Sequence, residues 1–140
     1  MQVSIIIPVY NAAAYVREAV ESALIQPETG EILLIEDNSP DDSLRICQEL
    51  AAKYDKVKLL RHPNGENRGP GASRNLGMRN ARSPILAFLD ADDYYLPGRF
   101  KLDKEIYAEN PLCDGVYHAI GMHIEDSEGL ERWNSAGKPP

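Results

Sequence analysis

Short apolar runs alternate with segments of helical periodicity along most of the chain. The apolar runs cover residues 3–9, 31–35, 57–60 and 84–89, and they are continuous, as expected of strands covered on both faces. Between and after them, apolar residues recur at helical spacing in residues 12–26, 40–54, 71–81 and 97–109. Repeated strand–helix units predict an α/β fold with an open, mostly parallel sheet and helices on both faces, because parallel strands need crossover connections.

The pattern also predicts where several elements begin and end. Ser39 followed by Pro40 is typical of an N-cap and first helical residue, so the second helix is expected to begin there. Residues 115–124 are predicted to form a further strand, residues 125–129 a polar hairpin turn, and residues 135–140 a frayed end. Residues 1–140 are therefore expected to form one domain that is incomplete at its C-terminus.

Composition narrows the class of protein. The 140 residues include 15 Lys and Arg against 22 Asp and Glu, a net charge of −7, which argues against a nucleic-acid polymer as partner. Two cysteines are too few for a disulfide framework and fit a reducing, cytoplasmic compartment. The apolar run 3–9 is far shorter than the ~20 residues of a membrane-spanning helix, so no transmembrane segment is expected.

The charge is unevenly distributed, and the chain contains one basic segment. Residues 61–82 hold a single acid, Glu66, and five arginines, which are Arg61, Arg68, Arg74, Arg79 and Arg82. Such a segment in an acidic chain suggests an anion site, for example for a phosphate. Arginines that only coat a helix would produce the same pattern, and both interpretations stay open on charge alone.

Polar residues follow three of the predicted strands directly. They are Pro8, Tyr10 and Asn11 after the first strand, Glu36, Asp37 and Asn38 after the second, and Asp90, Asp92 and Asp93 after the fourth. In an open parallel sheet, ligands bind beyond the carboxyl ends of the strands, near the point where the strand order reverses. We therefore expect these residues to meet at one edge of the sheet.

The three acids after the fourth strand are the strongest candidate for a metal site. Mg²⁺ or Mn²⁺ in phosphate chemistry takes one or two carboxylates, and phosphate oxygens and water complete the shell. A solvated turn that caps the next helix is the alternative. The segment also resembles the haloacid-dehalogenase-type phosphatases, with Asp90 as nucleophile. That family places Thr or Val where Tyr94 stands.

The glycine-rich segment before the third helix does not match a nucleotide-binding loop. Gly69-Pro70-Gly71 begins like G-x-G-x-x-G, but Arg74 occupies the third glycine position, and no G-x-x-x-x-G-K-[ST] occurs in the chain. What remains is Arg68 just before the helix and Arg74 near its start, which suit an anion or a nucleotide. His62, ahead of this segment, is expected in a loop.

Taken together, four segments resemble the family 2 glycosyltransferases, enzymes of the Rossmann-like GT-A fold. The segments are VSIIIPVYN, EILLIEDNSPDDS, NRGPGASRNLG and LDADDYYLPGRF, and they occur in the family's order with strand–helix spacing between them. The resemblance covers the chain up to about residue 110. It implies a domain that binds a nucleotide-diphospho-sugar, typically a UDP-sugar, with Mn²⁺ or Mg²⁺ as cofactor.

The resemblance also implies roles for single residues. Asp37 would accept a hydrogen bond from the base, beside the main chain of Pro8 and Val9. Tyr10 and Asn11 would help to form the base pocket, and Arg68 and Arg74 would lie near the nucleotide or its diphosphate. The remaining residues form the metal motif: Asp90 and Asp92 are the DxD pair, Asp92 is the first choice for metal contact and Asp93 the second.

Members of this family usually invert the anomeric centre, with a carboxylate that takes the proton of the acceptor hydroxyl. That base is expected beyond residue 140, so this chain alone is expected either to act as the donor domain of a glycosyltransferase or to bind nucleotide sugars without activity. The donor sugar stays open, as does the acceptor, which is a carbohydrate, a lipid-linked molecule or a protein. Docking of a longer enzyme on the inner face of the membrane also stays open.

Overall fold

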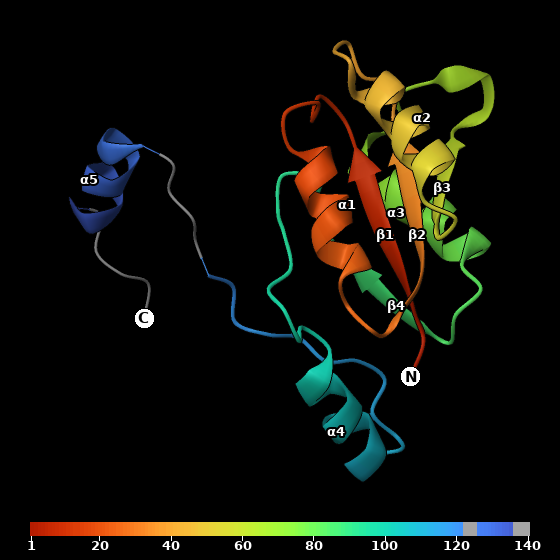
Figure 1. The fold of residues 1–140 in the computed structure, drawn as a ribbon, viewed down its shortest axis with the longest axis vertical. Coiled ribbons are helices and arrows are strands. Elements are labelled where there is room, and N and C mark those ends of the chain that lie inside the picture. The colour runs from red at the N-terminus through yellow and green to blue at the C-terminus, as the bar shows by residue number, and fades with distance from the viewer. Residues whose placement is uncertain (122–125, 136–140) are drawn as a thin grey trace.

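The computed structural model describes residues 1–121 and 126–135 and contains a four-stranded parallel sheet (Figure 1). The strands are β1 (Val3–Val9), β2 (Thr29–Glu36), β3 (Val57–Arg61) and β4 (Ile85–Phe88). Their order in the sheet is β3-β2-β1-β4, and all three pairings are parallel. The first four predicted strands and the parallel α/β architecture are confirmed.

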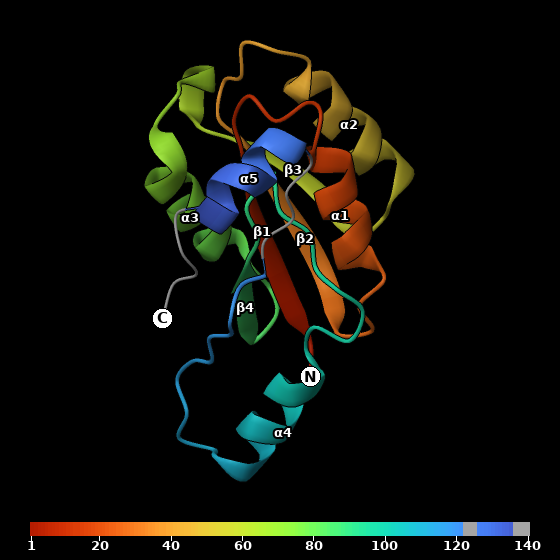
Figure 2. The same cartoon turned by 90° about the vertical axis from the view of Figure 1, so that its left-hand side faces the viewer.

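Helices cover both faces of the sheet, as predicted (Figure 2). They are α1 (Val16–Leu24), α2 (Ser43–Lys53), α3 (Gly69–Asn80), α4 (Lys101–Glu109) and α5 (Ser127–Ser135), with a 3₁₀ turn, η1 (Pro63–Gly65), before α3. Helices α1 and α2 pack against each other and against β2 on one face, whereas α3 packs on β1 and β2 on the other. Helices α1 and α4 are shorter than the periodicity predicted, because the segments before them are turns.

Alternate residues of the central strands supply two separate cores. Ile5 and Ile7 of β1 are fully buried beneath α1 and α2, in one cluster with Leu34. Ile6, between them, points to the other face and packs with Leu33 in a smaller cluster that α3 closes. A strand with side chains buried on both faces has no polar alternation, which explains the continuous apolar runs of the sequence.

Helix α3 approaches β1 very closely at Gly77. A Cβ atom at this position would lie 2.5 Å from Cγ2 of Ile6 and 3.0 Å from its Cγ1, which is closer than carbon atoms can pack. Gly71, in the first turn of the same helix, has no atom within 4 Å of its Cβ position. Glycine at residue 77 therefore sets the distance between α3 and the sheet.

The second helix begins later than Ser39 and Pro40 predicted. Helix α2 starts at Ser43, and residues 39–42 form the loop before it. The hydroxyl of Ser39 does not cap the helix, because it accepts the N–H of Asn11 at 3.1 Å. The N–H of Ser43 is bound instead by the carboxylate of Asp41, at 3.0 Å.

The prediction for the C-terminal region is wrong in two respects. Residues 115–121 form no strand and their side chains are largely exposed, with Tyr117 and Ile120 at 95% and 94%; residues 122–124 lie outside the described part. Residues 127–129 belong to helix α5 and not to a hairpin turn, since the carboxylate of Asp126 accepts the N–H of Gly129 at the start of that helix. Helix α5 lies apart from the sheet in Figure 1.

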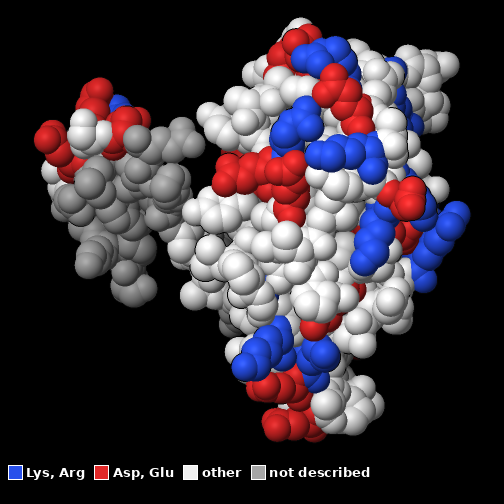
Figure 3. Space-filling model, viewed as in Figure 1, with Lys and Arg blue, Asp and Glu red and all other residues white. Residues whose placement is uncertain are grey.

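None of the helices in the described part of the chain is long and apolar enough to cross a membrane. The apolar run 3–9 of the sequence forms the strand β1. Charged side chains of both signs are interspersed over the face drawn in Figure 3, so the net negative charge does not gather in one broad patch on that face.

Candidate functional site

The strand order reverses at β1, and the predicted site residues gather at that point. The chain runs from β1 to β2 and β3 on one side and then returns to place β4 on the other side of β1. The carboxyl ends of β1, β2 and β4 therefore meet at one edge of the sheet, which is where open α/β sheets bind ligands. Tyr10, directly after β1, is 55% exposed at this edge, while Pro8 is half-buried and Val9 is buried.

The loops after β1 and β2 are bound to each other through the N–H groups of the first loop. The N–H of Ala12 donates to Oγ of Ser43 at 2.9 Å, and the N–H of Ala13 donates to Oδ2 of Asp41 at 3.0 Å. Asn11 and Asn38 both have positive φ, 51° and 58°, a conformation that asparagine tolerates better than most residues. The two loops thus form one fixed wall of the site.

Glu36 fixes the conformation of the loop after β2. Its side chain is fully buried, and it accepts the N–H of Ser39 at 2.6 Å and Nε of Arg61 at 2.8 Å. A buried carboxylate needs such partners, because its charge is costly away from water. Glu36 therefore orients the residues around Asp37 and does not itself face the open edge of the site.

Asp37 lies at the N-terminus of α3 and is 2% exposed. Its Oδ1 accepts the N–H of Arg68 at 2.7 Å, and its Oδ2 accepts the N–H of Gly69 at 2.8 Å. Its carbonyl oxygen accepts the side-chain amide of Asn67 at 2.8 Å. The sequence suggested an external anion at the start of this helix. In the structure, Asp37 already binds two of the N–H groups there. A carboxylate has roughly four acceptor positions, so a further donor can still bind it.

Arg74 and Asp90 are brought together, at 2.6 Å between Nη2 and Oδ1. The pair links α3 to the end of β4 across the point of strand reversal, and its side chains are 35% and 54% exposed, so solvent weakens it. Arg68 directs its guanidinium to Glu66 at 2.8 Å. The basic segment is therefore partly neutralised within the protein.

The acidic segment forms a turn directly after β4. The N–H of Asp93 donates to the carbonyl of Asp90 at 3.0 Å, and Asp92 and Asp93 are both exposed. Partial burial, together with the charges of Asp92 and Asp90, raises the pKa of Asp93. The three carboxylates thus repel one another, which is the electrostatic condition under which a cation binds.

The loop that follows is anchored to α1 by residues that sequence reasoning missed. The hydroxyl of Ser22 accepts the N–H of Tyr95 at 3.0 Å. Gln26, 1% exposed, donates to the carbonyl of Leu96 at 3.1 Å and accepts the N–H of Arg99 at 3.0 Å. Their signal in the sequence is weak: both are polar residues at the end of an amphipathic helix.

The donor set fits a divalent cation that is shared with a ligand. Within residues 1–121 and 126–135, no group of three or more His, Cys, Asp and Glu side chains converges as a complete metal site. Asp92 and Asp93 nevertheless offer exposed, hard oxygen ligands. Mg²⁺ and Mn²⁺ are commonly held by one or two carboxylates together with substrate phosphates, so these residues fit either ion.

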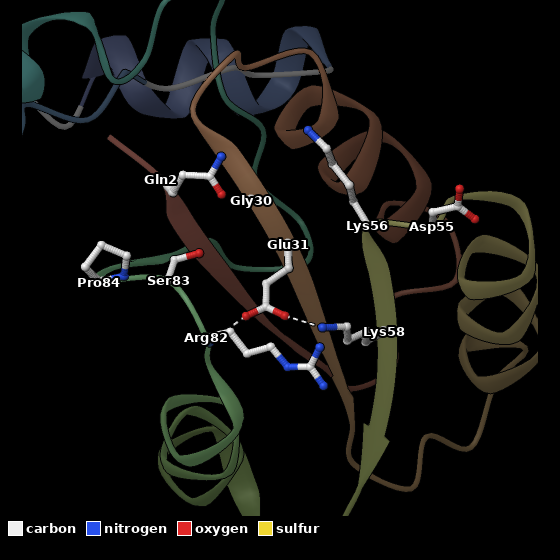
Figure 4. Close-up of a pocket in the computed structure, with 9 residues that line it drawn as sticks. All are labelled: Gln2, Gly30, Glu31, Asp55, Lys56, Lys58, Arg82, Ser83 and Pro84. Carbon is white, nitrogen blue, oxygen red and sulfur yellow. Dashed lines mark hydrogen bonds and ion pairs between the residues drawn. The ribbon is translucent and has the colours of Figure 1, made fainter.

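A cavity of about 440 Å³ lies at the opposite edge of the sheet, at the amino ends of the strands (Figure 4). Its floor carries Glu31, whose carboxylate accepts Ser4 Oγ at 2.8 Å, Lys58 Nζ at 2.5 Å and the N–H of Arg82 at 2.6 Å. Burial opposes the ionisation of Glu31, but these hydrogen bonds outweigh it and lower its pKa. This cluster ties the start of β4 to β1 and β2.

Comparison with known proteins agrees with this geometry. The model of the family described as Glycosyl transferase family 2 matches residues 4–135. The chain therefore belongs to this family, and the resemblance seen in the sequence is confirmed. The chain is 42% identical over 110 residues to an uncharacterized glycosyltransferase of Rickettsia felis, and the matched region covers 78% of this chain and 18% of the relative. The chain is 41% identical over 143 residues to the minor teichoic acid biosynthesis protein GgaA of Bacillus subtilis, and this match covers 94% of this chain and 30% of the relative.

Solved structures share the fold. S. aureus TarS 1-349 in complex with UDP superposes with a TM-score of 0.68 at 28% identity, over 79% of this chain and 33% of that chain. The mannosyltransferase PcManGT from Pyrobaculum calidifontis, solved with GDP-Man and Mn²⁺, superposes with a TM-score of 0.62 at 24% identity. This match covers 72% of this chain and 30% of that chain. The GT-A fold is thereby confirmed. The chain spans between 18% and 33% of the length of these relatives.

Proposed function

We propose that this chain is the donor domain of a glycosyltransferase that takes its sugar from a nucleotide-diphospho-sugar, in the first place a UDP-sugar. The observation that carries the proposal is that Asp37 and the Arg74–Asp90 pair lie at the same carboxyl edge of the sheet, at the point of strand reversal. The complex of TarS with UDP, and that of TarS with UDP-GlcNAc, supports the choice of nucleotide. The sugar and the acceptor, whether carbohydrate, lipid-linked or protein, are not assigned.

In this proposal the base lies between the two loops that follow β1 and β2. The Asp37 carboxylate accepts the ring N–H of uracil, beside the main chain of Pro8 and Val9. The exposed ring of Tyr10 and the backbone at Asn11 form the outer wall of the base pocket. Arg74, in the second turn of α3, and, less directly, Arg68, at its N-cap, face the diphosphate.

The diphosphate and the metal belong to the acidic turn. Asp92 is our first choice as ligand of Mn²⁺ or Mg²⁺ and Asp93 the second, while Asp90 completes the DxD motif and is oriented by Arg74. When bound, the divalent ion neutralises the charge that develops on the leaving nucleoside diphosphate. The residues of this chain hold the donor, so that an acceptor hydroxyl can attack the anomeric carbon from the opposite side, with inversion.

Calorimetric titration with UDP, in Mn²⁺, in Mg²⁺ and in excess EDTA, tests the proposal. We expect binding that depends on the metal and that weakens about tenfold or more in Asp92→Asn, since a charge-assisted contact is worth about 1.5–3 kcal/mol. Asp55→Asn, the same change on an exposed residue at the opposite edge, serves as the matched control. Folded protein that binds no UDP with either metal would contradict the proposal.

Two further outcomes separate the alternatives. UDP binding without transfer or donor hydrolysis would indicate a nucleotide-sugar-binding module. Phosphate release from simple phosphate esters, lost in Asp90→Asn, would indicate the phosphohydrolase. The sequence makes the second outcome unexpected, because Tyr94 stands where that phosphatase family places Thr or Val.

A further inference from the structure

His62 is buried beside Asp37, although the sequence suggested an ordinary loop residue. It follows β3 directly, and its side chain is 4% exposed. Its Nε2 lies 3.1 Å from Oγ of Ser73 in α3 and 3.6 Å from Oδ1 of Asp37. Its carbonyl oxygen accepts the N–H of Gly65 at 3.0 Å, which fixes the turn η1 that leads toward α3.

The three side chains do not form a nucleophilic triad. In a Ser–His–Asp triad the serine and the aspartate bind different ring nitrogens, so that a proton can pass from the serine to the ring. Here the same nitrogen, Nε2, faces both Ser73 and Asp37. Ser73 is also completely buried, so neither a substrate nor water can reach it as they would reach a catalytic serine.

The charge distribution gives His62 a different role. Among the ion pairs of the described residues, Asp37 has His62 as its partner, while the guanidinium groups of Arg68 and Arg74 are turned to Glu66 and Asp90. The hydrogen bond of Nε2 is with Oγ of Ser73, and its 3.6 Å contact with Asp37 is electrostatic. We take His62 in the tautomer with hydrogen on Nε2, because a carboxylate attracts an N–H group and repels a ring nitrogen lone pair. The Nε2–H group then faces the same oxygen of Asp37 that accepts the N–H of Arg68.

We propose that His62 is a positioning residue of the base site: it holds the Asp37 carboxylate in the orientation that selects a base with a ring N–H donor. The inference rests on the proposed function of Asp37. Uracil offers such a donor at N3, whereas cytosine presents an acceptor there. A carboxylate held by His62 and by the N–H groups of Arg68 and Gly69 has only acceptor positions left for a base, so it accepts from uracil and repels the cytosine nitrogen.

The experiment compares the affinities for UDP and CDP in the protein with saturating Mn²⁺. In His62→Asn, which is too short to place a donor at the position of Nε2, we expect the UDP preference to fall about tenfold. In His62→Gln, whose amide nitrogen reaches that position, we expect the preference to stay within about twofold of the original. A structural role alone would weaken UDP and CDP binding equally and leave their ratio unchanged.

His118→Gln is the matched control, since His118 is bound to Asp103, outside the base site, and should leave the UDP preference unchanged. An unaltered preference in a folded His62→Asn would overturn the inference. An unaltered preference in Asp37→Asn would refute the proposed role of Asp37, and the inference with it. If His62→Asn does not fold, loss of the preference in His62→Gln would overturn it equally. Absence of UDP binding in the original protein would instead refute the proposed function, and the inference with it.

Discussion

Replacing Gly77 by alanine tests whether the absence of a side chain at this position determines the distance between α3 and the sheet. The new Cβ would lie 2.5 Å from Cγ2 of Ile6 and 3.3 Å from its Cβ. Ile6 is β-branched and fully buried in the central strand, so its methyl group cannot rotate away. Helix α3 must therefore move outward, and Arg74, one turn earlier on the same helix, moves with it.

The expected cost follows from two opposing effects. Overpacking a well-packed core costs about 1–3 kcal/mol, whereas alanine in place of glycine within a helix gains about 1 kcal/mol. We therefore expect Gly77→Ala to lower the free energy of unfolding by roughly 1 kcal/mol, with a melting temperature about 3 °C lower for a domain of this size. The displaced Arg74 should also weaken UDP binding.

Gly71→Ala is the matched control on the same helix. No atom lies within 4 Å of its Cβ position, so only the helix preference acts. Since Gly71 lies in the first turn, where that preference is weaker than in the helix interior, we expect a gain of about 0.5 kcal/mol. Urea unfolding of the three proteins, followed by circular dichroism, measures both changes. If Gly77→Ala proves as stable as Gly71→Ala, the close packing of α3 on β1 is refuted.

Three further predictions concern charges and thiols. Asp93→Asn removes a charge that burial and its neighbours disfavour, so calorimetric scans without metal should show a higher melting temperature, while titration should show weaker Mn²⁺-dependent UDP binding. Burial opposes the ionisation of Glu31, but Lys58 and other donors lower its pKa below the ordinary 4.5. The ionised carboxylate therefore stabilises the fold above pH 4.5, and this stabilisation is lost as the pH falls through the lowered pKa. Glu31→Gln should flatten the acid side of a curve of stability against pH, measured by urea unfolding. Burial raises the pKa of Cys47 to about 12, so a chromogenic disulfide reagent at pH 8 should label Cys113 in the native protein and both thiols only after unfolding.

Residues 3–9 and 84–89 show why the sheet could be predicted from the sequence. A strand covered on both faces must be apolar at every position, and the chain leaves a turn or helix between such runs. The same rule placed Asp37 and Asp90 correctly, since a residue that directly follows a parallel strand lies at the carboxyl edge. The prediction of both required only the order of elements and not their contacts.

The start of α2 and the burial of His62 depend on contacts between distant segments. Ser39 would cap a helix in isolation, but Asn11, 28 residues away in sequence, takes its hydroxyl. His62 stands among polar residues in the sequence, and its burial involves Ser73 of α3 and Asp37 after β2, which lie beside its ring. The sequence predicts a strand over residues 115–124, but no strand of the described structure pairs with residues 115–121.

The two halves of the site differ in how their charges are balanced. Asp37 and Glu36 are buried, both accept backbone N–H groups, and Glu36 also accepts Nε of Arg61, so the half of the site proposed for the base keeps its shape without a ligand. No ion pair among the described residues reaches Asp92 or Asp93, and the pKa of Asp93 is raised. Ordering a site on binding costs free energy. We therefore expect a nucleoside to bind the base half without this cost, whereas the diphosphate adds affinity only when a divalent cation joins it to the acidic turn.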